Sequence, residues 1–248
     1  MSGHSKWAQI KRQKASTDAR RGQMFTKLGR EITVAARAGG DPESNFRLRL
    51  AIQRARDANM PLENIERAIK RATGGADSAA LEEITYEGYG PGGAAILIEA
   101  MTDNRNRAVS EIRNVFTRAG GSLGESGCVA WLFDPRGVIT IDPEGQDSDD
   151  IALLAIDAGA EDVKTEDHSV EVYTNPGDLE QVRRALEEHR VKVVSAETEM
   201  VPKTTIELDA KASEQVLRLM DKLEELDDVQ RVYSNVDFPD ELLEEYTG

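Results

Sequence analysis

The chain has 248 residues, of which 31 are lysine or arginine and 46 are aspartate or glutamate, so its formal net charge is −15. An apolar fraction of 39% is ordinary for a globular protein and excludes a largely disordered chain. No apolar run reaches the roughly 20 residues of a membrane helix, and a single cysteine, Cys128, excludes an internal disulfide or a cysteine-based zinc site. We expect two or three domains, no secretory signal, no membrane contact and a cytoplasmic location.

The charges are divided unevenly along the chain. Residues 1–73 hold 16 of the 31 basic residues and 7 of the 46 acidic ones, a net charge of +9, whereas the remainder carries −24. Such asymmetry is typical of a protein with one polyanion-binding end, and nucleic acid is the partner that it indicates. The alternative is a basic helical surface that is only solvated. We expect the acidic part to keep the protein in solution and to restrict how it approaches a polyanion.

Residues 1–20 have almost no apolar periodicity, and they predict a basic arm that stays mobile until it binds. Lysines and arginines surround Trp7, and cations interleaved with an aromatic ring suit a largely sequence-independent grip on nucleic acid. In the alternative, Trp7 only packs on the domain that follows. The candidate contacts in and beside this arm are Lys6, Trp7, Lys11, Arg12, Lys14, Arg20 and Arg21.

Residues 21–75 predict a basic three-helix domain. Apolar residues recur at helical spacing over 21–37, over 44–58 and again after Pro61. We expect a small bundle with basic outer faces, and its further candidate contacts with nucleic acid are Lys27, Arg47 and Arg54. The predicted buried stripes are Phe25, Leu28, Ile32 and Ala35 in the first helix, Leu48, Ala51, Ile52 and Ala55 in the second, and Leu62, Ile65, Ala68, Ile69 and Ala72 in the third.

The rest of the chain alternates strands with helices. Strands are predicted at 94–101 and 129–133, with a helix between them that Thr102 or Asp103 caps. Residues 138–196 predict the order βαββαβ of a ferredoxin-like domain, in which Ser148 caps the first helix. Residues 204–233 add a strand, a helix and a strand, which are too few for a domain alone.

These elements predict the α+β class, with an N-terminal three-helix domain and two ferredoxin-like α/β domains, one inserted in the other. The segments 80–134 and 203–240 are each half a domain, so we expect them to fold together as one discontinuous domain. Residues 137–201 then form the inserted domain.

The run Gly88-Tyr89-Gly90-Pro91-Gly92-Gly93 satisfies G-x-G-x-x-G, the pattern of dinucleotide sites. Such a site needs a strand before the run and a helix after it. Here a strand follows, and Pro91 has no N–H to offer a phosphate. We interpret the run as a turn that its glycines permit. In the alternative, Tyr86 and Tyr89 present their rings to a partner for stacking.

The run Asp103-Asn104-Arg105-Asn106-Arg107 opens a predicted helix. Arg105 and Arg107 either reach a phosphate or base edge or belong to a solvated first turn, and both interpretations stay open. The three histidines are scattered, the acidic residues lack EF-hand spacing, and no nucleophile motif stands out. We therefore expect no metal, no cofactor and no enzymatic activity.

Six stretches together carry a family resemblance: Gly3-His4-Ser5-Lys6-Trp7, the basic run to Arg21, Phe25-Thr26-Lys27, residues 86–93, residues 103–107 and Gly159-Ala160-Glu161-Asp162. In this combination the chain resembles the YebC family along its whole length. The resemblance implies a helical N-terminal domain and two α/β domains. It also implies a DNA-binding transcriptional regulator, as bacterial members are classed, or a translational activator, as the mitochondrial relatives are. Some bacterial members are ribosome-associated factors that aid the synthesis of proline-rich stretches, and no catalytic residues carry over.

Three hypotheses about function remain open at this stage. In the first, the basic module grips duplex DNA near promoters. In the second, it grips ribosomal or transfer RNA as part of a translation factor, and this version is favoured mechanistically because no recognition helix or symmetric dimer is evident. The third is a small-ligand sensor, which paired ferredoxin-like domains permit but nothing in the sequence specifies.

Overall fold

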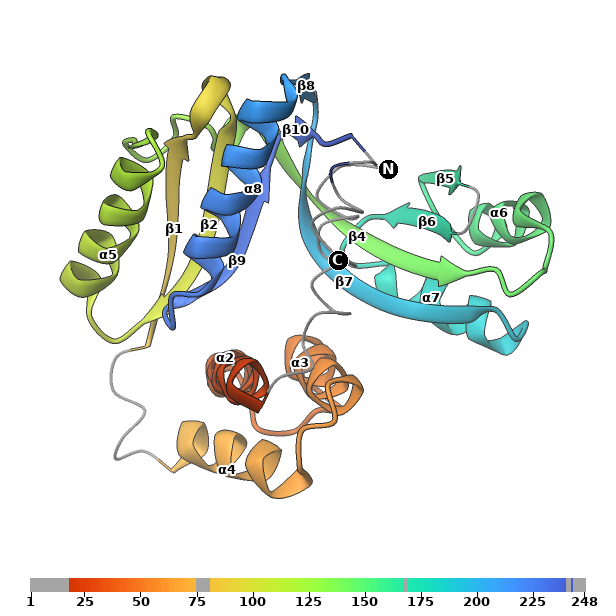
Figure 1. The fold of residues 1–248 in the computed structure, drawn as a ribbon. Coiled ribbons are helices and arrows are strands. Elements are labelled where there is room, and N and C mark those ends of the chain that lie inside the picture. Colours follow the sequence, from red (N-terminus) through yellow and green to blue (C-terminus); the bar gives the residue numbers. More distant parts are fainter. Residues whose placement is uncertain (1–17, 75–80, 167–168, 240–241, 243–248) are drawn as a thin grey trace.

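The computed structural model of the chain describes residues 18–74, 81–166, 169–239 and 242. The candidate contacts Lys6, Trp7, Lys11, Arg12 and Lys14 lie outside these residues. A helical domain lies at the bottom of Figure 1, and two domains built on β-sheets lie above it. None of the helices in the described ranges combines the length and the apolar character of a membrane span.

The helical domain, called the head below (residues 18–74), is a bundle whose predicted stripes meet in one core. The exception is Leu62, which is 59% exposed at the start of the third helix. The first helix begins at Asp18, so residues 18–20 are helical and do not belong to the predicted arm. Asn45 caps the second helix by accepting a hydrogen bond from the Leu48 N–H at 3.1 Å. The helices are α2 (Asp18–Ala36), α3 (Phe46–Asp57) and α4 (Leu62–Thr73).

The first α/β domain combines two distant parts of the chain in one antiparallel sheet of order β3-β1-β2-β9, with α5 and α8 packed on one face (Figure 1). A short parallel pair, β8 with β10, lies beside it. The elements are β1 (Glu82–Tyr89), η1 (Pro91–Gly93), β2 (Ala95–Thr102), α5 (Arg105–Arg118), β3 (Ser122–Leu123), η2 (Ala130–Leu132), β8 (Ile206–Glu207), α8 (Ala210–Glu224), β9 (Val229–Ser234) and β10 (Val236–Asp237).

The inserted domain has the chain order βαββαβ and an antiparallel sheet of order β5-β6-β4-β7, which is the ferredoxin-like arrangement. Its two helices pack together on the sheet around a core that includes Ile139, Val172 and Leu186. The elements are β4 (Phe133–Asp142), α6 (Ser148–Asp157), β5 (Asp162–Glu166), β6 (Ser169–Thr174), α7 (Leu179–Glu188) and β7 (Lys192–Pro202).

The predicted fold class is confirmed, including the insertion of one ferredoxin-like domain in the other. Three strands were missed, the two-residue strands β3 and β10 and the longer strand β1. Strand β1 (Glu82–Tyr89) lies between β2 and β3 and occupies the place that the third strand of a ferredoxin-like sheet would take. It precedes β2 in the chain and is joined to it by a hairpin, whereas the third strand of the βαββαβ pattern follows the second, so the connection differs although the layers are the same.

The strand predicted at 129–133 is wrong. Residues 130–132 form the 3₁₀ turn η2, and the strand begins only at Phe133. The reason is a tertiary contact, because the N–H groups of Val129 and Ala130 donate to the buried carboxylate of Glu87 and not to a neighbouring strand.

Two predicted helix caps also need correction. Asn104 caps α5, in place of Thr102 or Asp103, and accepts a hydrogen bond from the Arg107 N–H at 3.1 Å. Asp147 caps α6 in place of Ser148, which is the first helical residue. In both cases the cap is one residue away from the prediction, a typical error where several polar residues adjoin a helix start.

The glycine-rich run is a turn between β1 and β2, as the sequence predicts. Gly92 has φ +68°, a left-handed conformation that favours glycine. Gly88 is needed for a different reason: a Cβ there would lie 2.6 Å from the Ser122 carbonyl oxygen and 2.8 Å from the Phe116 ring. The run therefore serves close packing of the hairpin against β3 and α5.

Glu87 of β1 is a buried carboxylate, 4% exposed, that holds the loop before η2 in place. It accepts hydrogen bonds from the N–H groups of Gly127 at 2.6 Å, Val129 at 2.7 Å and Ala130 at 2.7 Å. Burial alone would raise the pKa of Glu87, but these three donors outweigh burial and lower it.

Replacing Glu87 by glutamine should lower the free energy of unfolding by about 2 kcal/mol near neutral pH, because a buried amide cannot accept all three hydrogen bonds. Since the pKa of the folded state is lowered, the stabilisation by Glu87 is present above the ordinary value of 4.5 and is lost as the pH falls below it. Urea unfolding of both proteins at neutral and acid pH measures this. The exposed Glu125→Gln is the control, and a wild-type advantage that persists unchanged in acid would contradict the assignment.

Candidate nucleic-acid interface

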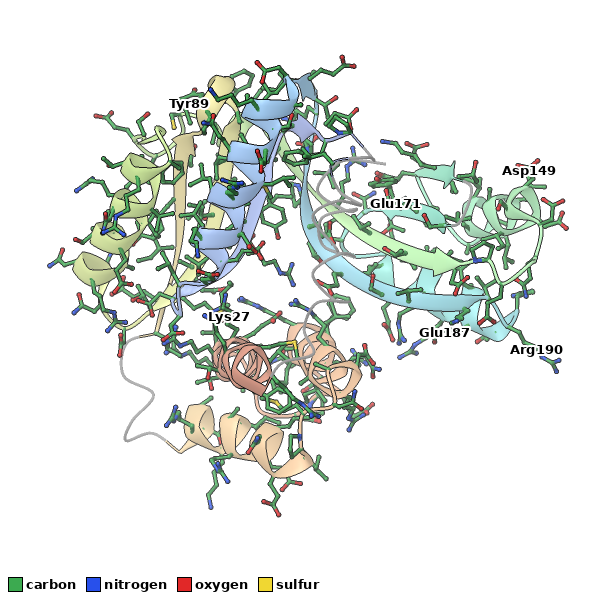
Figure 2. The ribbon with its side chains drawn as sticks, in the orientation of Figure 1. Lys27, Tyr89, Asp149, Glu171, Glu187 and Arg190 are labelled. Carbon is green, nitrogen blue, oxygen red and sulfur yellow. The ribbon has the colours of Figure 1, made fainter. Side chains whose placement is uncertain are left out.

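The basic face of the head that carries Lys27 is turned toward the rest of the protein. The two α/β domains together are called the body below. The Lys27 ammonium donates to the carbonyl oxygen of Glu224 at 2.6 Å, and Figure 2 shows Lys27 pointing from α2 toward the first α/β domain. Gln23 donates to the carbonyl oxygen of Glu225 at 2.5 Å. The candidate Lys27 is thus held at the end of α8 in this conformation.

Asp228 is the acidic centre of the contact between the head and the first α/β domain. Its side chain is 2% exposed and lies between α8 and β9. Arg30 of the head reaches it at 2.9 Å, and Arg107 of α5 reaches it at 2.8 Å. The Thr102 hydroxyl donates to the same carboxylate at 2.9 Å. A single buried carboxylate therefore joins the head to the run 103–107.

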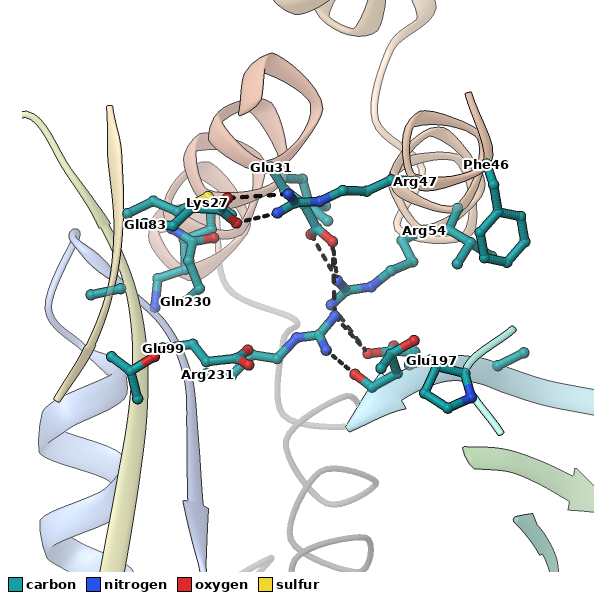
Figure 3. A pocket seen from close by; sticks show the side chains of 18 of the residues that line it. Lys27, Glu31, Phe46, Arg47, Arg54, Glu83, Glu99, Glu197, Gln230 and Arg231 are labelled. Atoms are coloured by element: carbon teal, nitrogen blue, oxygen red, sulfur yellow. Dashed lines mark hydrogen bonds and ion pairs between the residues drawn. The ribbon is translucent and has the colours of Figure 1, made fainter. Parts of the chain in front are cut away.

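All three domains meet at a network of two arginines and two glutamates, shown in Figure 3. Arg54 of α3 lies 2.7 Å from Glu31 of α2 and 3.1 Å from Glu197 of β7. Arg231 of β9 lies 3.5 Å from Glu197 and 3.8 Å from Glu31. All four side chains are between 16% and 22% exposed. The candidate Arg54 is thus part of a partly buried network that links the head to both parts of the body.

Tyr233 extends this network into the core of the first α/β domain. Its side chain is buried, and its hydroxyl donates to Glu99 at 3.2 Å. Burial first, and then the negative charge of Glu99, raise the pKa of Tyr233 against the lowering effect of Arg231. Tyr233 therefore remains a neutral hydrogen-bond donor, and the charge at the junction is carried by the arginines and glutamates.

The candidate Arg47 forms an ion pair with Glu83 of β1 and closes one side of a cleft between the head and the body. The hydrogen bond to Glu83 comes first among the effects that raise the pKa of Arg47. The cleft has a volume of about 700 Å³, within the range of ligand pockets. Its arginines are paired with its own glutamates, so the cleft offers no set of charges dedicated to a ligand.

The two arginines of the run 103–107 differ in their surroundings. Arg107 pairs with Asp103 at 2.8 Å as well as with Asp228, and these hydrogen bonds raise its pKa. Arg105 is 67% exposed, and its ion pair with Glu82 is longer than those of Arg107, at 3.6 Å. Arg107 therefore holds the start of α5 against Asp228, whereas Arg105 is accessible to a partner.

A group of cations on α4 was not among the candidates from sequence. Arg67, Lys70 and Arg71 are exposed, and none makes an ion pair with the part of the chain that the structure describes. They lie between the middle and the C-terminal end of the helix, outside the stripe of Ile65 and Ala68. Figure 1 shows α4 on the side of the head that is remote from the body. We call Arg67, Lys70 and Arg71 the outer face. Their position outside the apolar stripe is the signal that could have found them.

The remaining candidates of the head lie at the start of α2. Arg20 is within the first turn of the helix, and Arg21 is exposed with its guanidinium 5.6 Å from the centre of the Phe25 ring. Arg21 is therefore accessible next to the segment that holds the arm candidates.

The two tyrosines of the glycine-rich run do not form a stacking pair. Tyr86 is partly buried against the core of the first α/β domain, and Tyr89 is 40% exposed. The Tyr89 hydroxyl and the Trp131 indole N–H both donate to the Cys128 carbonyl oxygen, at 3.0 and 3.1 Å. Figure 2 places Tyr89 at the end of the domain far from the head, so its ring is separate from the basic surfaces of the head. Within the described ranges, no cluster of three or more His, Cys, Asp or Glu side chains is placed to hold a metal ion.

The fold and these surfaces define a three-domain α+β protein with a basic helical head and two ferredoxin-like domains. The chain belongs to the TACO1/YebC family: residues 5–75 match the model of the TACO1/YebC N-terminal domain, and residues 81–236 match that of the second and third domains.

Relatives and a solved structure agree along almost the whole chain. It is 58% identical to a "Probable transcriptional regulatory protein" of Pelotomaculum thermopropionicum, covering 97% of this chain and 100% of the relative. It is 57% identical to a protein of the same name from Moorella thermoacetica, covering 99% of each. A crystal structure of a conserved hypothetical protein from Aquifex aeolicus matches with a TM-score of 0.83 and 46% identity, over 91% of this chain and 94% of that one.

Replacing Asp228 by asparagine should lower the free energy of unfolding by about 3 kcal/mol, because two arginines then lose a buried partner. Thermal and urea unfolding of the variant measure the loss. The neighbouring Asp227→Asn is the matched control, since Asp227 is exposed, and it should change little. Equal stabilities of the two variants would show that Asp228 does not hold the contact between head and body.

Proposed function

We propose that the protein is a non-enzymatic, cytoplasmic regulator of gene expression that binds nucleic acid through the cations of its head. The observation that carries the proposal is the outer face: Arg67, Lys70 and Arg71 are exposed on one helix without carboxylate partners among the described residues. Unpaired cations on one surface attract a phosphate backbone and release its counterions. The names of the relatives, which call them transcriptional regulatory proteins, support the regulatory part of the proposal.

We further assign nucleic-acid contacts to the candidates of the arm. Lys11, Arg12 and Lys14 precede α2 in sequence, and Arg21 is exposed in the first turns of that helix. Cations on an arm together with cations on a helix face contact phosphates without reading bases, so we expect affinity with little sequence preference from them. Arg105, the exposed arginine of the run 103–107, is a further candidate contact on the body.

RNA is the second candidate for the polyanion, and the structure of α4 favours it. A recognition helix presents its N-terminal residues to base edges in the major groove of DNA. The start of α4 instead carries the exposed acidic residues Glu63 and Glu66, and the three cations follow from Arg67 onward. A surface of this kind fits irregular RNA through phosphate contacts. The corresponding function is a translation factor that associates with ribosomal or transfer RNA and aids the synthesis of proline-rich stretches.

Reversing the outer face, Arg67→Glu with Lys70→Glu and Arg71→Glu, should weaken binding to duplex DNA and to a structured RNA by at least about tenfold, because three phosphate contacts are lost. The salt dependence of log K should flatten by about 2.7 for duplex DNA. Fluorescence anisotropy over a salt series measures both. A second variant, Lys11→Glu with Arg12→Glu and Lys14→Glu, tests the arm in the same way.

The matched control for the outer face reverses three exposed cations on another helix, Lys211, Arg218 and Lys222 of α8. It makes the same change in total charge on the body. If this control weakens binding as much as the outer-face variant does, binding responds only to total charge, and the proposed surface is wrong.

Crosslinking in cells, followed by sequencing of the recovered RNA and DNA, decides between the two polyanions. A translation factor should yield ribosomal or transfer RNA, and a promoter-binding regulator should yield DNA near transcription starts. Recovery of both nucleic acids only at background level, as with the outer-face variant, would contradict the proposed function altogether.

A further inference from the structure

The head has a second set of cations, on the surface that faces the body. We call Lys27, Arg30, Arg47 and Arg54 the inner face. Each of them contacts an oxygen of the body: the Glu224 carbonyl for Lys27, and the carboxylates of Asp228, Glu83 and Glu197 for the three arginines. Figure 3 shows Arg47 and Arg54 directed at glutamates across the cleft.

The groups that cover the inner face have the chemistry of a phosphate backbone. They are anionic or carbonyl oxygens, and a guanidinium binds carboxylate and phosphate in the same planar geometry. The two terminal nitrogens of the Arg47 guanidinium, Nη1 and Nη2, for example, both donate to the Glu83 carboxylate. The body therefore supplies to the head a row of acceptors like those of a nucleic acid.

The contacts of the four inner-face cations with the body are ion pairs and hydrogen bonds. Leu50 of α3 packs against the core of the inserted domain, whereas the other contacts described above are ion pairs and hydrogen bonds. Glu83 and Arg47 are 46% and 54% exposed, so their pair is open to solvent and to salt. Interfaces of this polar kind between domains allow relative motion.

We propose that the inner face is a second nucleic-acid-binding surface, which carboxylates of the body cover in this conformation and which a phosphodiester backbone uncovers by competing for the same cations. This inference rests on the proposed function, because it concerns how the head engages the same class of ligand. A cleft of about 700 Å³ does not admit a nucleic-acid helix beside the inner face. Binding there requires the head to move away from the body.

The test neutralises the covering carboxylates and leaves every cation of the head in place. In the variant Glu83→Gln with Glu197→Gln, the affinity for a duplex DNA and for a structured RNA should rise by about tenfold, because two of the three carboxylates that cover the inner face are neutralised. The matched control, Asp134→Asn with Glu214→Gln, removes the same charge and also frees two cations of the body, Lys203 and Arg218, that are not candidate contacts. It should bind within about twofold of the wild type.

Movement of the head is measured independently by the distance between two spin labels. Asp57 of α3 and Glu188 of α7 are exposed, so cysteines there, with Cys128→Ser, report the separation of the head from the inserted domain. The distance should lengthen when either nucleic acid is added to the otherwise wild-type protein.

The outcomes separate this inference from the proposed function. If the neutralised variant binds no better than the control, or if the label distance stays constant in a saturated complex, the inner face is not a binding surface, while binding through the outer face still stands. If neither the wild type nor the neutralised variant binds either nucleic acid, both proposals fail. Tighter binding of the variant together with a longer distance supports the inference.

Discussion

The arrangement of the three domains depends on the network in which Arg54 and Arg231 share Glu31 and Glu197. It is the point at which side chains of the head, the first α/β domain and the inserted domain meet. A partly buried ion-pair network adds little net stability compared with apolar packing, but each of its members becomes costly when its partner is removed. The network thus fixes which surfaces face each other, and the cores within each domain supply most of the stability.

This constraint divides the cations of the head into two groups with different availability. The cations of the inner face form ion pairs with carboxylates of the body or donate to its carbonyl oxygens. The cations of the outer face remain exposed on α4. A net charge of +9 for residues 1–73 therefore overstates the charge that a partner meets in this conformation. It also explains why so acidic a protein can present a basic surface: part of the negative charge of the body is placed against the head, and α4 lies on the remote side.

Much of the fold followed from the sequence, because the periodicity of buried residues is a local property. The stripes of α2 and α3, the βαββαβ order of the inserted domain and the completion of one domain by the other half of the chain were predicted in this way. Strand β1 was missed because only two residues near its end are buried, and its glycine and three glutamates argue against a strand. The segment at 129–133 was misjudged because its hydrogen-bond acceptor, Glu87, belongs to a distant strand. The partners of the candidate arginines could not be predicted for the same reason, since Arg30 and Asp228 come together only through the tertiary fold.

In our interpretation, charge and not apolar area holds the head against the body. Small-angle X-ray scattering of the full chain across a series of sodium chloride concentrations tests it most directly, because the Debye length falls from about 10 Å at 0.1 M to about 3 Å at 1 M salt. The account predicts that the radius of gyration rises with salt while the helical circular dichroism signal stays constant. A radius of gyration that stays constant over the whole series would contradict it.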